Sequence, residues 1–102
     1  QDGDTKSLEQ LVIMDNEIKL FQNTPNPFNQ STSIKMQLPE RVQQADLMIY
    51  NLEGKQVDHR SINSRGLVEF ELAGGSLDAG MYIYALIVDG EVVDQKRMIL
   101  TQ

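Results

Sequence analysis

The sequence predicts an all-β domain of the immunoglobulin-like class, an antiparallel β-sandwich of about seven strands. Two observations support this expectation. Apolar and polar residues alternate with period two from Leu20 onward, and turn signals recur about every 8–12 residues. A chain of 102 residues is long enough for one such domain. No true immunoglobulin domain is implied, because the sequence has no cysteine and no tryptophan.

Three segments show the alternation of half-buried strands most clearly. Residues 33–38 alternate polar and apolar side chains until Pro39 interrupts the pattern, and in 47–50 Leu47 and Ile49 alternate with Met48 and Tyr50. Residues 68–72 have one apolar and one acidic face. Such two-faced segments are typical of antiparallel strands that cover a core on one side.

The segment 82–88 differs, because it is apolar on both faces. We therefore expect it to be a central strand. Asp89-Gly90 then predicts a two-residue turn of the kind that accepts positive φ, so 91–100 should return as its hairpin partner. Further turns are expected to close at Gly54, Gly66 and Gly80.

Residues 1–19 form a separate segment upstream of the domain at 20–102. Leu8, Leu11, Asp15 and Ile18 follow one another at three- or four-residue spacing, which favours a short amphipathic helix, the end of a coiled-coil stalk. An irregular linker is the alternative, with 12–14 pairing as a strand. The chain begins with Gln1 and lacks a charged-then-apolar leader, so we expect a fragment or a processed form.

Composition argues against several partners. The formal net charge is −6, whereas nucleic-acid binding requires clustered Lys and Arg. No apolar run reaches the ~20 residues of a membrane-spanning helix. Without cysteine, neither thiolate chemistry nor Cys-ligated metals are available.

Catalytic candidates are few. The one histidine, His59, follows Asp58, but adjacent strand residues point to opposite faces, so we interpret His59 as an exposed strand residue. Asp2 and Asp4 resemble the start of a calcium loop, whose later ligands are missing. We therefore expect no catalytic residues, no cofactor and no metal site.

Four motifs in order resemble the type A C-terminal sorting domains of the type IX secretion system of Bacteroidota. They are N-T-P-N-P-F-N at 23–29, I-Y-N-L-E-G-K-Q-V at 49–57, L-D-A-G-M-Y-I-Y at 77–84 and K-R-M-I-L at 96–100. The resemblance covers about 20–100 and implies a seven-stranded immunoglobulin-like sandwich. The residues expected to serve the fold are Pro25, Asn26, Pro27, Phe28 and Gly54.

This resemblance implies an address label on a larger exported protein. The outer-membrane translocon would recognise the folded domain in the periplasm and carry the cargo to the cell surface. A sortase-like peptidase would then cut before Leu20. The residues that the resemblance assigns to recognition are Gly80, Tyr82, Lys96, Arg97 and Leu100.

Alternatives remain at two points. Lys96 and Arg97 either protect an edge strand from pairing or present charge to a receptor. The stretch 80–90 also resembles the ends of tail-fibre-like surface proteins, in which the domain would be a retained cap that forms homo-oligomers through residues 1–19. Carbohydrate binding is a third candidate, although the chain lacks the tryptophan that sugar platforms favour.

Overall fold

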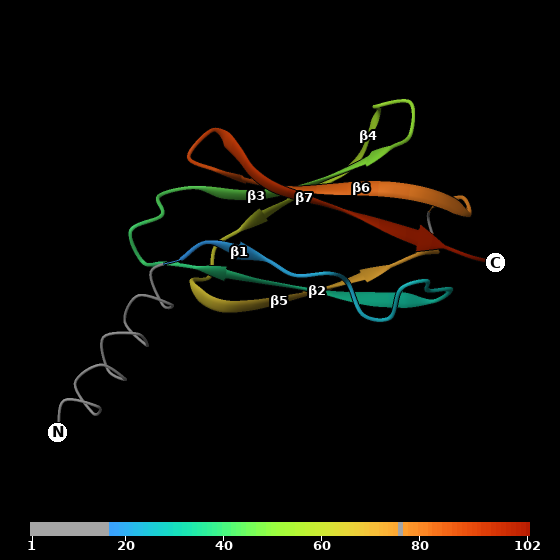
Figure 1. Ribbon diagram of the computed structural model, residues 1–102, viewed down its shortest axis with the longest axis horizontal. Coiled ribbons are helices and arrows are strands. Elements are labelled where there is room, and N and C mark those ends of the chain that lie inside the picture. The colour runs from blue at the N-terminus through green and yellow to red at the C-terminus, as the bar shows by residue number, and fades with distance from the viewer. Residues whose placement is uncertain (1–16, 76) are drawn as a thin grey trace, which may run out of the picture.

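The computed structural model describes residues 17–75 and 77–102 and contains seven strands within them (Figure 1). Residues 1–16 of the helical or linker segment predicted for 1–19 lie outside the described residues, as does its predicted oligomerisation. The strands are β1 (Lys19–Leu20), β2 (Ser31–Leu38), β3 (Ala45–Asn51), β4 (Gln56–Ile62), β5 (Gly66–Ala73), β6 (Gly80–Val88) and β7 (Glu91–Leu100).

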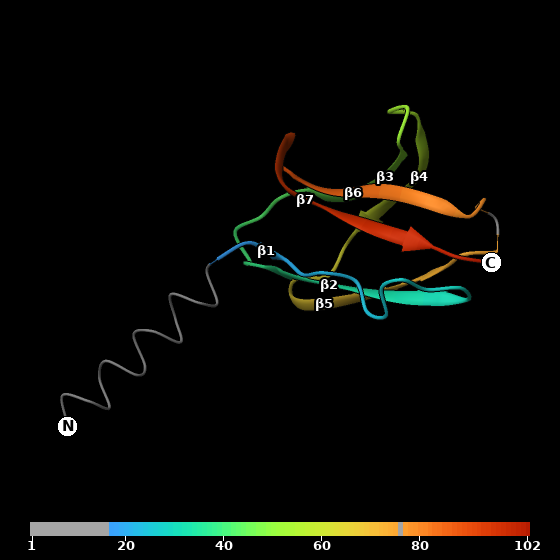
Figure 2. The ribbon, with the colours of Figure 1, turned by 45° about the vertical axis from the view of Figure 1, so that its right-hand side comes forward.

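The strands form two antiparallel sheets that pack face to face. One sheet has the order β1-β2-β5, and the other has the order β4-β3-β6-β7. Figures 1 and 2 show the two layers from different sides, with the β3–β4 hairpin projecting beyond the sandwich. The predicted all-β sandwich of seven strands is confirmed, and β6 is the interior strand that its two apolar faces predicted.

The core lies between the sheets and follows the period-two alternation. In β2, Ile34, Met36 and Leu38 are fully buried, while Lys35 between them is exposed. Leu47 of β3 and Leu86 of β6 are fully buried from the opposite sheet. Each such side chain contributes roughly 1.5–3 kcal/mol through removal of apolar surface from water.

The outer faces of the two sheets differ in polarity. On the three-stranded sheet, the Ser33 hydroxyl donates to Glu69 across β2 and β5. On the four-stranded sheet, Met48, Ile83 and Ile87 are half-buried on the face opposite the core. β6 is therefore apolar on both of its faces, as 82–88 indicated.

The turns predicted at Asp89-Gly90 and at Gly54 are present. Asp89 and Gly90 have φ of 49° and 88°, as the hairpin between β6 and β7 requires. The Asp89 carboxylate also accepts the N–H groups of Gln43 and Gln44, at 3.1 and 2.8 Å. Gly54, with φ of 88°, closes the β3–β4 turn.

Residues 21–29 cross from one sheet to the other. Thr24 makes an antiparallel bridge to Ser33 of the three-stranded sheet, and Phe28 makes a parallel bridge to Leu100 of the four-stranded sheet. Both the Thr24–Pro25 and Asn26–Pro27 bonds are cis. We call residues 21–29 the crossing segment. It closes one side of the sandwich beside β1 and β7 (Figure 2).

Inside the crossing segment, Asn23 fixes the local path of the backbone. Its side chain is buried and donates to the Pro25 carbonyl at 3.1 Å and to the Thr32 hydroxyl at 3.0 Å. The Thr32 hydroxyl donates to the same carbonyl at 2.8 Å. Because buried polar groups must find partners, this triangle of bonds accounts for a polar residue in the core.

Candidate recognition site

The β6–β7 hairpin brings all five residues predicted for recognition onto two neighbouring strands. Gly80 at the start of β6 lies opposite Leu100 at the end of β7, and Tyr82 lies opposite Met98. Arg97 lies opposite Ile83 and Lys96 opposite Tyr84. The register therefore connects the 77–84 and 96–100 motifs directly.

Tyr82 and Leu100 belong to the core. Tyr82 is 6% exposed, and its hydroxyl donates to the Asp78 carbonyl, so it reaches the rim as a core tyrosine does. Burial raises the pKa of Tyr82 above its ordinary value. Leu100 is 3% exposed and packs with Phe28 against Gly74. Because they are buried, Tyr82 and Leu100 can affect recognition only through the conformation of the β6–β7 hairpin.

Lys96 and Arg97 lie on β7, which is an edge strand of the four-stranded sheet. Lys96 shares the inner face with Met98 and Tyr84, is 34% exposed, and has Nζ 3.9 Å from the carboxylate of Asp94. Arg97 points to the outer face and is exposed. An inward-facing charge at a sheet edge opposes pairing with other chains, so β7 has the property of a protected edge.

Beside these two cations the surface is hollowed. The hollow has a volume of about 340 Å³ and is lined by Gln22, Ile83, Gln95, Lys96 and Arg97. Its lining combines a cationic pair, two carboxamides and one aliphatic side chain.

The crossing segment is bonded to the free edge of β7. The Asn26 Oδ1 accepts the N–H of Ile99 at 2.9 Å, and the N–H of Phe28 donates to the Ile99 carbonyl at 2.9 Å. The N–H of Thr101 donates to the Phe28 carbonyl at 2.8 Å, and the Gln22 side chain donates to the Arg97 carbonyl. Motif residues from opposite ends of the domain's sequence are thus in contact.

Asn26 and Phe28 were expected to serve the fold, and their contacts with β7 were not predicted from the sequence. Phe28 is 3% exposed and fills the end of the sandwich, as its place in the motif indicated. The bond from Ile99 to Asn26 spans 73 residues, so no local pattern identifies it.

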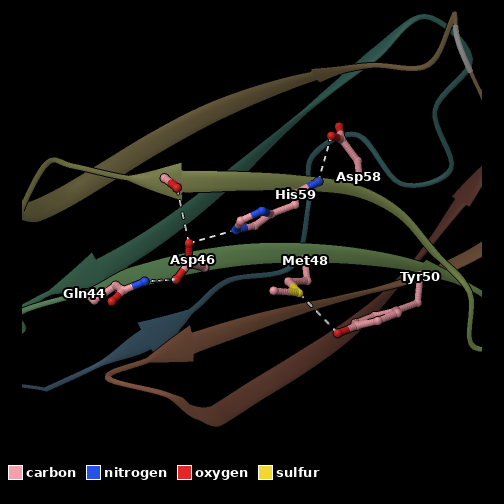
Figure 3. A network of polar contacts seen from close by, with 7 residues as sticks. Gln44, Asp46, Met48, Tyr50, Asp58 and His59 are labelled. Carbon is pink, nitrogen blue, oxygen red and sulfur yellow. Dashed lines mark hydrogen bonds and ion pairs between the residues drawn. The ribbon is translucent and has the colours of Figure 1, made fainter.

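A second polar cluster surrounds Asp46 on the outer face of the four-stranded sheet (Figure 3). His59 Nε2 lies 2.8 Å from Asp46 Oδ1, and the Ser61 hydroxyl donates to the same oxygen at 3.3 Å. The Gln44 side chain donates to the other oxygen at 3.3 Å. The bond with His59 is the main cause of a lowered pKa for Asp46.

This cluster differs from what the sequence suggested for His59. The residue is exposed on a strand, as expected, and Asp58 accepts only its backbone N–H. The partner of the ring, Asp46, was missed because the contact depends on the register between β3 and β4. In a nucleophile triad the imidazole lies between serine and carboxylate. Here the carboxylate lies between Ser61 and His59, an arrangement that supports the sheet.

The described residues contain no group of three or more His, Asp or Glu side chains placed to hold a metal ion. Among the same residues, no helix has the length and apolarity needed to cross a membrane.

The fold is an immunoglobulin-like sandwich whose edge strand β7, which carries Lys96 and Arg97, is bonded to a motif from the other end of the domain's sequence. Residues 24–101 match the protein family described as the secretion system C-terminal sorting domain, and the chain belongs to this family. It is a sorting signal of type IX secretion, which the family match favours over the retained cap. No curated protein matches the chain.

Proposed function

We propose that the basic part of β7 is the surface through which the secretion machinery recognises this domain. The observation that carries the proposal is the position of Lys96 and Arg97 on an edge strand, beside a hollow that both residues line. Arg97 makes no contribution to the core, because its side chain is exposed on the outer face. A cation in this position is free to meet an acidic partner.

The sorting domain marks a protein that is exported to the cell surface or the extracellular space. We infer that the domain folds in the periplasm and binds there to the outer-membrane translocon. A sortase-like peptidase then separates the cargo from the domain by a cut before Leu20. The domain itself acts without catalysis, and the placement of Asp46 between Ser61 and His59 supports this inference.

The test is a charge-removing variant of the full-length parent in its own host. Replacing both cations, in K96A/R97A, should leave the fold intact and leave the cargo in the periplasm. The matched control is K35A/K55A, which removes one exposed cation from β2 and one from the β3–β4 turn. Surface delivery of K96A/R97A at the level of the control variant would overturn the proposal.

A further inference from the structure

We propose that Asn26 is a positioning residue for recognition, because it holds the C-terminal half of β7 in the geometry that the secretion machinery reads. The inference rests on the proposed function of β7. It adds that the 23–29 motif and the 96–100 motif form one site. A partner would then require the contact between them, and not the basic strand alone.

The contact uses backbone groups that β7 would otherwise leave open. Ile99 points its N–H and its carbonyl away from β6, and both are bonded to the crossing segment. Arg97, two residues earlier, offers its carbonyl to Gln22 on the same edge. The end of β7 is thus held from both sides, by β6 as far as Leu100 and by the crossing segment over 97–101.

A substitution at Asn26 leaves the core unchanged, whereas a substitution at Asn23 or Phe28 does not. Its side chain is exposed, whereas Phe28 fills the end of the sandwich and Asn23 shapes the crossing segment from within. Loss of the Asn26 carboxamide removes one bond from the β7 edge and no apolar surface from the core. The effect should therefore appear in the strand that carries Arg97 and little elsewhere.

The geometric consequence concerns Arg97. A terminal strand whose outer bonds are lost opens more often, because only the bonds on one side then oppose opening. Arg97 lies at the boundary of the held region, so opening of 97–101 would change the direction of its side chain. Recognition of a charge at a fixed place depends on such positioning.

The experiment compares two substitutions at one position in the whole 102-residue chain and in the full-length parent. N26A removes the acceptor for the Ile99 N–H, whereas N26D keeps an oxygen there. We expect N26A to raise the exchange rate of the Ile99 amide about tenfold, the effect of losing one hydrogen bond. We expect surface delivery to fall several-fold, with N26D close to the unchanged chain in both readouts.

Two controls separate positioning from general instability. N29A changes another exposed Asn of the same motif. I62V trims a core side chain at the end of β4, on the far side of the sheet from β7, at a cost of about 0.5–1.5 kcal/mol. Both should deliver cargo normally. Loss of delivery in I62V equal to that in N26A would show a stability effect and overturn the inference.

The outcomes also separate this inference from the proposed function. Normal surface delivery of the K96A/R97A variant would contradict the proposed function. Failure of K96A/R97A together with normal delivery by N26A, despite faster exchange at Ile99, would overturn the inference alone. Unchanged exchange at Ile99 in N26A would overturn it too. Should N26A fail to fold, Q22A tests the same edge through its bond to Arg97, with the same expected loss of delivery.

Discussion

Asp46 and His59 face each other across β3 and β4, with His59 Nε2 2.8 Å from Asp46 Oδ1. This contact holds the pKa of Asp46 below its ordinary value of 3.8. A carboxyl whose pKa is lowered in the folded state stabilises the fold above its unfolded pKa. That stability is lost as the pH falls through the folded pKa. The domain should therefore lose stability in acid through this pair.

We expect H59Q to reduce this acid sensitivity, because the main cause of the lowered pKa is then removed. His59 is partly exposed, so the difference should be at most about 1 kcal/mol between pH 7 and pH 3. Urea unfolding at intervals from pH 7 to pH 3 measures it. If the free energy of unfolding changed with pH in the same way for H59Q and for the unchanged chain, His59 would not be the main cause of the lowered pKa of Asp46.

Alanine substitutions at the adjacent Gly74 and Gly75 should differ in their effect on stability. A Cβ at Gly74 would lie 2.7 Å from Leu100 Cδ1 and 3.2 Å from Phe28 Cε2, whereas a Cβ at Gly75 meets nothing within 4 Å. We expect G74A to destabilise the domain by about 1–3 kcal/mol through overpacking, and G75A to have little effect. Thermal unfolding compares them. The double variant G74A/L100V should recover part of the loss if the clash with Leu100 is its cause.

Two leucines test the core in the same manner. Leu86 is fully buried, and Leu67 is 71% exposed. L86A should cost about 2–5 kcal/mol, because the removed side chain leaves a cavity between the sheets. L67A should change stability by about 0.5 kcal/mol or less. Similar unfolding free energies for both variants would contradict the sandwich core described above.

The Tyr84 hydroxyl connects β6 to the start of the crossing segment. It donates to the Phe21 carbonyl at 2.7 Å, and burial raises the pKa of Tyr84 to about 12. Y84F should destabilise the domain by about 1 kcal/mol, because the partly buried hydrogen bond to the Phe21 carbonyl is lost. Chemical denaturation at pH 7 provides the measurement, and an unchanged free energy of unfolding would show that water replaces the donor.

The strands and the core were predictable, because each depends on a local pattern. Alternation over 33–38 identified Ile34, Met36 and Leu38 as buried, and the apolar run at 82–88 identified an interior strand. Asp89-Gly90 likewise predicted its turn from two residues. Local sterics and side-chain periodicity are sufficient for such elements.

The contacts that build the site were not predictable in this way. The bond between Asn26 and the Ile99 N–H joins residues 73 apart, and that between Asp46 and His59 depends on the register of two strands. Alternation indicates which face a residue occupies and leaves its partner across the sheet open. The family resemblance named the motif at 23–29 without showing that it holds β7.

The most direct test of the central claim is a transfer experiment. Residues 20–102 are fused to an exported reporter that has no sorting signal of its own, and the fusion is expressed in the native host. We predict that the unchanged domain delivers the reporter to the cell surface and that K96A/R97A leaves it in the periplasm. A K96A/R97A fusion that reaches the surface as efficiently as the unchanged domain would contradict the role of β7.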